Sequence, residues 1–223
     1  MHKSIRKLLD NSFGQARCFF EESILELNGI SGFPENKGKQ RITEWGGTSS
    51  ALSAIAHFTN ITPTLINKID SSKQWLIGQN KNGSWNASGF YSLEATAGVM
   101  NDIYILNIIP DEIKKQSVKY IWDNYNSAGF FITSGSRDNP HIYTTYLILK
   151  CLTQYDHIPL ERKVEIKNWI HSIKRYDNKW GISNGCEASV AHSIYALCIL
   201  NFCGDDWNTI LNDYKDLILW ILK

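Results

Sequence analysis

The sequence predicts an all-α protein of four stacked helical hairpins and one additional helix at the C-terminal end. Apolar residues recur at helical spacing in every long segment, and no stretch alternates apolar and polar residues as a strand would. Helices rich in small residues also return at regular distances. Their equivalent positions are Ser50, Thr96, Thr145 and Ser193, separated by 46, 49 and 48 residues. A period in the high forties is typical of stacked helical hairpins.

The first hairpin combines an N-terminal helix with a short helix of small residues. Ser4–Asn28 shows helical apolar spacing, and the Gly32-Phe33-Pro34 run that follows ends such a helix. After a polar loop, Thr48 or Ser49 is expected to cap the second helix, which continues through Ile55.

The second hairpin has the clearest pattern of the four. Pro63 opens its outer helix at a position where the missing N–H costs nothing. The loop contains Gly83-Ser84-Trp85, and the second helix covers Ser92–Leu106. The outer helix is expected to bury one face, formed by Leu65, Ile69, Ser72 and Leu76 at i, i+4, i+7 and i+11.

The third and fourth hairpins repeat this order, and a proline opens each outer helix. Gly129-Phe130-Phe131 is the loop of the third hairpin, and His141–Leu152 is its second helix. Trp180-Gly181 marks the fourth loop, and Glu187–Leu200 is the second helix there. One final helix is expected to place its apolar residues on a single face: Trp207, Ile210, Leu211, Tyr214, Ile218 and Ile221.

The composition is that of a chain long enough to form one domain over residues 1–223. With 43% hydrophobic residues, the chain can bury a substantial core. A net charge of +1 provides no field that would attract nucleic acid or an anionic membrane. No apolar run is long enough to span a bilayer, and no apolar signal core follows the basic N-terminus. We therefore expect a cytoplasmic protein.

The cysteines indicate packing residues more than a disulfide framework. Their number is odd and no CxxC pair occurs, so reduced thiols are expected, with disulfides as the alternative. The five residues are Cys18, Cys151, Cys186, Cys198 and Cys203.

The loop of the second hairpin resembles a known motif. The run Leu76-x-x-Gln79-x-x-x-Gly83-x-Trp85 resembles the QW motif of squalene–hopene cyclases, oxidosqualene cyclases and the protein prenyltransferase β-subunits. In such a motif, we expect Gln79 to bond backbone groups at a helix end. We expect Trp85 to cover the seam to the next hairpin.

Weaker copies of the motif extend this resemblance along most of the chain. They occur at Trp122…Gly129-Phe130 and Trp169…Trp180-Gly181, so the similarity covers roughly Gly32–Leu200. The resemblance implies an α/α toroid. Because that family closes its ring with more hairpins than the four found here, a small or incomplete toroid is expected.

The resemblance also implies a candidate catalytic acid, Glu94. Class II cyclases use a protonated carboxylic acid at the start of an inner helix, in an apolar site that keeps the acid neutral. Glu94-Ala95-Thr96-Ala97 aligns with the acid-containing segment of oxidosqualene cyclases. However, Ser92 and Ala95 stand where the DxDD signature has neighbouring acids. The alternative is a structural glutamate, which the dipole favours in the first turn of a helix.

The zinc-dependent prenyltransferases provide a second comparison, and it implies no metal and no other cofactor. Their Tyr-His-Thr pattern binds zinc through the histidine, whereas this chain has Tyr143-Thr144-Thr145 at that place. His141 and His192 lie in different hairpins, where structural or solvent-facing roles are the alternative to ligand binding. Arg137 is a candidate for binding a diphosphate or carboxylate, with a solvated loop arginine as the alternative.

Two functional hypotheses follow. The first is an enzyme that acts on an isoprenoid-like apolar substrate by acid-initiated chemistry, with Glu94 as the acid. The second is a non-catalytic module that binds a peptide, a lipid or a partner subunit. Either site is expected at the loop end of the second helices, where the candidate binding residues are Tyr91, Arg137, His141, Tyr143, Glu187 and His192.

The open end of the repeat array is expected to be apolar and covered. An uncapped repeat exposes the face on which the next repeat would stack. A homodimer contact or another subunit is one cover, and the final helix is the other.

Overall fold

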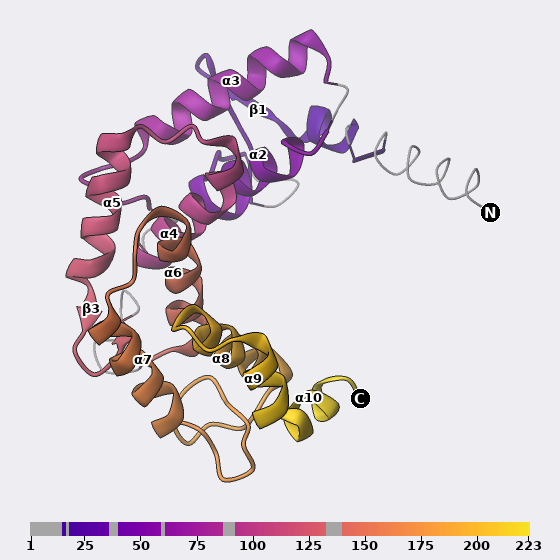
Figure 1. Cartoon of the computed structure of the whole chain (residues 1–223). Coiled ribbons are helices and arrows are strands. Elements are labelled where there is room, and N and C mark those ends of the chain that lie inside the picture. The colour runs from indigo at the N-terminus through magenta and orange to yellow at the C-terminus, as the bar shows by residue number, and fades with distance from the viewer. Residues whose placement is uncertain (1–14, 17, 36–39, 59–60, 87–91, 133–139) are drawn as a thin grey trace. The chain divides into compact units, whose positions relative to one another are not determined.

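A computed structural model describes residues 15–16, 18–35, 40–58, 61–86, 92–132 and 140–223 (Figure 1). The predicted site residues Tyr91 and Arg137 lie outside these ranges. The chain divides into two compact units, Met1–Ile113 and Lys114–Lys223. A single domain over residues 1–223 therefore remains a prediction.

The first unit contains a small antiparallel hairpin, several short helical segments and two longer helices. Residues 15–16 and 18–23 are helical, ahead of the β1–β2 hairpin. The longer helix α3 packs against β2 and α2 packs against α4 (Figure 1). The named elements are β1 (Leu25–Leu27), β2 (Ile30–Gly32), η1 (Glu44–Thr48), α2 (Ser49–Ile55), α3 (Pro63–Gly78), α4 (Ser92–Ile103) and η2 (Tyr104–Leu106).

The second unit consists of helices with one very short hairpin. The helix α5 begins at the end of the first unit and continues into the second. Within the second unit, α6 and α8 pack side by side, and α7 packs against α8 (Figure 1). The elements are α5 (Asp111–Asp123), β3 (Tyr125–Asn126), β4 (Phe130–Phe131), α6 (Ile142–Tyr155), α7 (Leu160–Ser172), α8 (Val190–Phe202), α9 (Trp207–Asp213) and α10 (Lys215–Ile221).

The predicted all-α class is confirmed, although two small hairpins interrupt the helices. The first helix was predicted to reach Asn28, but the helical residues end at Ser23. Asn28 and Gly29 take φ values of 55° and 78°, a left-handed pair that reverses the chain. The resulting β2 is held by α3, whose Ser71 hydroxyl accepts the Ser31 N–H at 3.2 Å. A tertiary contact therefore overrides the helical spacing.

The predicted buried face of the outer helix α3 is confirmed. Thr62 caps α3 by accepting the Leu65 N–H, and Pro63 follows at the first helical position as expected. On α7 the buried residues are Ile166, Trp169 and Ile170, which also lie on one face of the helix. On α3 the buried residues are the four predicted ones: Leu65, Ile69, Ser72 and Leu76.

The predicted single C-terminal helix is wrong in two respects. It is broken at Tyr214, where φ −116° and ψ 27° separate α9 from α10. Ile210 is buried as predicted, but the break rotates α10 relative to α9, so Leu217 is buried as well, while Trp207 and Leu211 are 47% and 49% exposed. Coverage of this end by a second copy or another subunit remains a prediction.

The second helix of each hairpin, which we call the inner helix, holds the preceding loop with one buried hydroxyl group, the hydroxyl clamp. In the second hairpin, Thr96 Oγ1 accepts the Trp85 N–H at 3.0 Å and lies 3.5 Å from the Trp85 carbonyl oxygen. Ser193 Oγ does the same for Trp180, with an N–H···O distance of 3.2 Å. Thr145 Oγ1 accepts the Phe131 N–H at 3.3 Å.

In the first hairpin, the predicted repeat position Ser50 is wrong. Thr48, not Ser50, accepts the N–H of the loop aromatic Phe33, at 3.0 Å. With Thr48 in the first place, the clamp residues are separated by 48, 49 and 48 residues (96−48, 145−96 and 193−145). The hydroxyl of Ser50 instead donates to Asp102. The true period is therefore more regular than the sequence pattern indicated.

Two of the loop aromatics are also fixed through their rings. Trp85 Nε1 donates to the Leu76 carbonyl at 2.7 Å, and Trp180 Nε1 donates to the Ile170 carbonyl at 2.9 Å. Both indoles are fully buried. The Trp180 ring also packs on Tyr214 at 5.4 Å, so it covers the seam to the following helices. The expected bond from Gln79 is present only at 3.5 Å, to the Trp75 carbonyl.

We predict that Thr96→Val lowers the free energy of unfolding by about 1–3 kcal/mol, because a buried backbone N–H loses its acceptor while the side-chain shape is kept. Urea denaturation of the purified chain measures this loss. Thr153→Val is the matched control, since that hydroxyl lies on the exposed side of α6 and bonds only within its helix. Equal stability of the two variants would contradict a structural role for the clamp.

Candidate functional site

The first candidate region is a stripe on α4 formed by Glu94, Gly98 and Asp102, which are spaced at i, i+4 and i+8. Ser49 and Ser50 of α2 both donate to Asp102 Oδ2, at 2.7 and 2.8 Å. The stripe therefore faces α2 and the turn η1 before it.

The indole of Trp45 covers the middle of this stripe. A Cβ added at Gly98 would lie only 2.2 Å from Trp45 Nε1, so the ring rests directly on the glycine backbone. Trp45 comes from η1, where its φ of −91° and ψ of 145° leave the helical region before the helix α2 starts. Glycine at position 98 is thus required by the close approach of an aromatic ring.

Glu94 lies at the N-terminal end of the same stripe. It is in the first turn of α4 and is 4% exposed. Its chain neighbours Leu93 and Ala95 are fully buried. A carboxyl group in such a place can be held neutral by its apolar surroundings or charged by the dipole of the helix. Its role as an acid remains a prediction.

The second candidate region is a set of rings on α6 and α8, which we call the α6–α8 aromatic cluster. Tyr146 stacks on Tyr195 with centroids 4.7 Å apart, and Tyr143 lies 5.4 Å from the same ring. Further along, Tyr146 stacks on Phe202 at 6.0 Å. All of the rings are partly exposed. The cluster consists of His141, Tyr143, Tyr146, His192, Tyr195 and Phe202.

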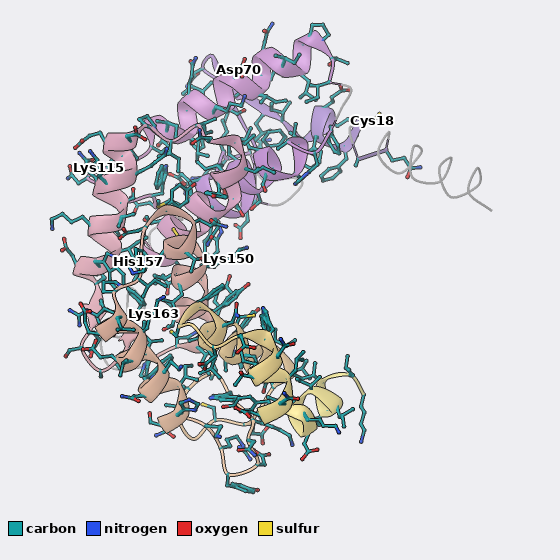
Figure 2. All side chains as sticks on the ribbon, in the orientation of Figure 1. Cys18, Asp70, Lys115, Lys150, His157 and Lys163 are labelled. Atoms are coloured by element: carbon teal, nitrogen blue, oxygen red, sulfur yellow. The ribbon has the colours of Figure 1, made fainter. Side chains whose placement is uncertain are left out.

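The order of these contacts defines the direction of the two helices. The imidazoles of His141 and His192, at the start of the helices, lie 6.3 Å apart, and the pair Tyr146–Phe202 lies further along both. The helices α6 and α8 therefore run in the same direction, as equivalent elements of successive repeats do. Lys150, labelled in Figure 2, follows Tyr146 by one turn of α6.

The environment of the cluster is apolar enough to disfavour charge. Burial raises the pKa of Tyr146 above its ordinary value, with a further contribution from Cys198 and Tyr195. Burial also lowers the pKa of His192, while burial and then repulsion from His192 lower the pKa of His141. Both imidazoles are therefore neutral at physiological pH.

One hydrogen bond fixes the orientation of His192. The Ser189 hydroxyl caps α8 by accepting the backbone N–H of His192 at 3.1 Å, and it lies 2.6 Å from Nδ1 of the same residue. In contrast, Nδ1 of His141 is buried and has no hydrogen-bond partner among the described residues.

Three of the predicted binding residues lie together in the structure, and Glu187 is found in a loop instead of a helix. His141, Tyr143 and His192 come together in the α6–α8 aromatic cluster. Glu187 was predicted in the first turn of an inner helix, but α8 begins only at Val190, and Glu187 is an exposed loop residue. The reason is the clamp loop: the Ser189 N–H donates to the Trp180 carbonyl at 3.0 Å, which keeps the chain extended up to that point.

Several residues of these regions were not predicted, although the sequence contains a signal for some. Tyr143 and Tyr146 are spaced at i and i+3, as are His192 and Tyr195, so each pair occupies one face of its helix. The contacts between the two helices, in contrast, depend on their packing. Trp45 and Asp102 were missed because their partners are far away in the sequence.

The fold and its repeated clamp define an α/α repeat protein with aromatic loops. The chain belongs to the prenyltransferase alpha-alpha toroid domain family, whose profile matches residues 79–223. The predicted family is therefore confirmed.

Comparisons with individual proteins are less specific. Thirteen chains of solved structures match, among them the type II terpene cyclase MstE from Scytonema in its apo form. That match has 14% sequence identity and a TM-score of 0.45 and covers 71% of this chain. It covers 54% of the cyclase, so the chain spans about half the length of that protein. A comparison with curated proteins gives no match.

The described residues contain neither a helix that could span a membrane nor a cluster of metal-binding side chains. No helix among them has both the length and the apolar character needed to cross a membrane. Within the same ranges, no three His, Cys, Asp or Glu side chains gather as a metal site. The five cysteines are free thiols.

We predict that the free energy of unfolding decreases as the pH falls below about 6.5, the ordinary pKa of histidine. His141 and His192 have pKa values below 6.5 in the folded chain. The unfolded chain therefore binds protons first as the pH falls, and stability is lost until the folded pKa is reached. Urea denaturation at several pH values measures this slope.

The double variant His141→Phe/His192→Phe should have a shallower slope than the natural chain. His157→Phe is the control, because that histidine is exposed on a loop (Figure 2). Burial also lowers the pKa of His171, so this residue supplies a residual slope in the double variant and in the control. An unchanged slope in the double variant would show that the cluster does not disfavour protonation.

Proposed function

We propose that this chain is a terpene cyclase- or prenyltransferase-like protein that binds an isoprenoid-like apolar molecule. The observation that carries this proposal is the α6–α8 aromatic cluster, a row of partly exposed rings on two adjacent inner helices. Such rings offer a large apolar area and faces that attract positive charge. Membership of the toroid family supports the same assignment.

We further propose that Glu94 is the acid that starts a cyclisation. In this step, the carboxyl proton is transferred to a carbon–carbon double bond of the substrate, and the resulting carbocation is attacked by a second double bond. Loss of a proton then completes the reaction. The burial of Glu94 in the first turn of α4 supports this role, because an apolar site favours the protonated acid.

A non-catalytic binding module is the second candidate, and one observation favours it. The class II cyclases that the chain resembles have neighbouring acidic residues in their DxDD signature. In this chain the second carboxylate of the stripe, Asp102, lies eight residues from Glu94. That spacing is about 12 Å along a helix. Asp102 is also engaged by two serine hydroxyls. A peptide, lipid or partner subunit would then occupy the inner-helix surface.

We predict that Tyr195→Ala weakens the binding of an acyclic isoprenoid such as geranylgeraniol by about 10-fold to 100-fold. A buried aromatic contact with the ligand is worth about 1.5–3 kcal/mol. Titration followed by intrinsic fluorescence measures the affinity. Tyr176→Ala is the matched control, because Tyr176 is 94% exposed in a loop. Equal loss in both variants, or no loss in either, would count against the cluster as the binding surface.

We predict that Glu94→Gln abolishes product formation from any acyclic isoprenoid that the natural chain cyclises, while folding and ligand affinity are nearly kept. The amide has the same shape but cannot donate the proton. Gas chromatography with mass spectrometry detects the products, and circular dichroism checks the fold. An unchanged rate removes the acid role of Glu94. Binding by the natural chain without any product supports the binding module instead.

A further inference from the structure

Two imidazoles stand at one end of the α6–α8 aromatic cluster, and they are its only nitrogen-bearing rings. His141 is the N-cap of α6, and His192 is in the first turn of α8. Each lies beside a tyrosine of its own helix, Tyr143 at 6.4 Å and Tyr195 at 6.1 Å between centroids. The cluster thus continues from phenol and phenyl rings, whose faces are apolar, into a pair of imidazoles.

The local hydrogen bonds determine which ring nitrogen of His192 can serve a ligand. The Ser189 oxygen already accepts the His192 backbone N–H, so its single hydrogen is free to be donated to Nδ1, 2.6 Å away. A neutral imidazole that accepts at Nδ1 carries its proton at Nε2. His192 therefore presents an N–H donor at Nε2.

His141 favours the same tautomer for a different reason. Its Nδ1 is buried without a partner among the described residues. A buried N–H without an acceptor is rarer in proteins than a buried acceptor without a donor, so the proton is better placed at Nε2. The two histidines then offer two N–H donors and no positive charge.

The distance between the rings allows both donors to reach one atom. A hydrogen bond of about 2.9 Å puts the acceptor about 4 Å from the centroid of an imidazole. Two rings whose centroids are 6.3 Å apart can satisfy this for a single oxygen located between them. The rings are also nearly perpendicular, at 78°, so their edges can converge from different directions.

The charge of this end favours an uncharged acceptor. Protonation of either imidazole places a cation in a partly buried site, next to a second imidazole and at the positive end of a helix dipole. Lys150 is the cationic residue on the same face of α6, and it lies beyond Tyr146, away from the histidines. A diphosphate gains most from Arg, Lys or a metal ion, and a neutral oxygen needs none of these.

We infer that the ligand of the α6–α8 aromatic cluster carries an uncharged oxygen, a hydroxyl or carbonyl group, which accepts hydrogen bonds from His141 and His192 while its isoprenoid-like body lies on the tyrosines and Phe202. This inference rests on the proposed function, because it names the head group of the molecule proposed to bind there.

Three fifteen-carbon probes with the same chain test it: farnesol, the hydrocarbon β-farnesene, and farnesyl diphosphate. Their affinities are measured by fluorescence titration for the full chain and for His192→Phe, which keeps an aromatic ring and removes the N–H. The quantity of interest is the ratio of farnesene to farnesol dissociation constants. Comparing this ratio between two proteins cancels the different solubilities of the probes in water.

We expect this ratio to fall by about fivefold to tenfold in His192→Phe, the effect of losing one hydrogen bond to a ligand. Farnesene affinity should stay within about twofold, which also shows that the variant is folded. His157→Phe, on an exposed loop, should leave both affinities unchanged. His141→Phe is a second variant with the same expected direction.

The possible failures are distinguishable. If neither farnesol nor farnesene binds, the proposed function itself fails, and the inference fails with it. If both bind and the ratio is the same in His192→Phe and His141→Phe, the inference alone is overturned. It is also overturned if farnesyl diphosphate binds more tightly than farnesol to the natural chain and loses that advantage in His192→Phe.

Discussion

The buried hydroxyl group at the start of each inner helix is the interaction on which the other features depend. A loop aromatic must be buried to seal a hairpin, but burying it also removes its backbone N–H from water. An unsatisfied buried N–H is costly, so each loop needs an acceptor at that depth. Thr48, Thr96, Thr145 and Ser193 provide it and are all fully buried.

The same constraint places the candidate functional residues. Because the clamp ties the loop to the first turns of the inner helix, residues near that turn are held in fixed positions. Glu94 precedes the clamp residue Thr96 by two positions, and His192 directly precedes Ser193. His141 precedes Thr145 by four positions and caps the helix. A site built next to such a clamp gains rigidity from a bond that the fold already requires.

The two candidate regions differ in how they combine polar and apolar groups. The α4 stripe has a buried carboxyl group four positions before Gly98, on which an indole rests. The α6–α8 aromatic cluster instead uses neutral rings, and its polar groups are tyrosine hydroxyls and two imidazoles whose protonation is disfavoured. An apolar molecule is compatible with the rings of the cluster, because aromatic faces offer a large apolar area.

The sequence by itself determined the helical class, the repeat and the buried face of α3, because these follow from local spacing of apolar residues. It also identified Trp85 and Trp180 as structural residues, and their indoles are indeed buried and bonded to outer-helix carbonyls. Glu94, His141, Tyr143 and His192 were singled out from motif and position.

Only the tertiary structure decided the remaining features, because they depend on contacts between residues far apart in the chain. The hydroxyl of Thr48 rather than Ser50 reaches Phe33, 15 positions away, and β2 forms where α3 supports it. The break at Tyr214 turned Leu217 inward and left Trp207 outside. Likewise, the row of rings on α6 and α8 exists because two helices pack in the same direction, which no local pattern encodes.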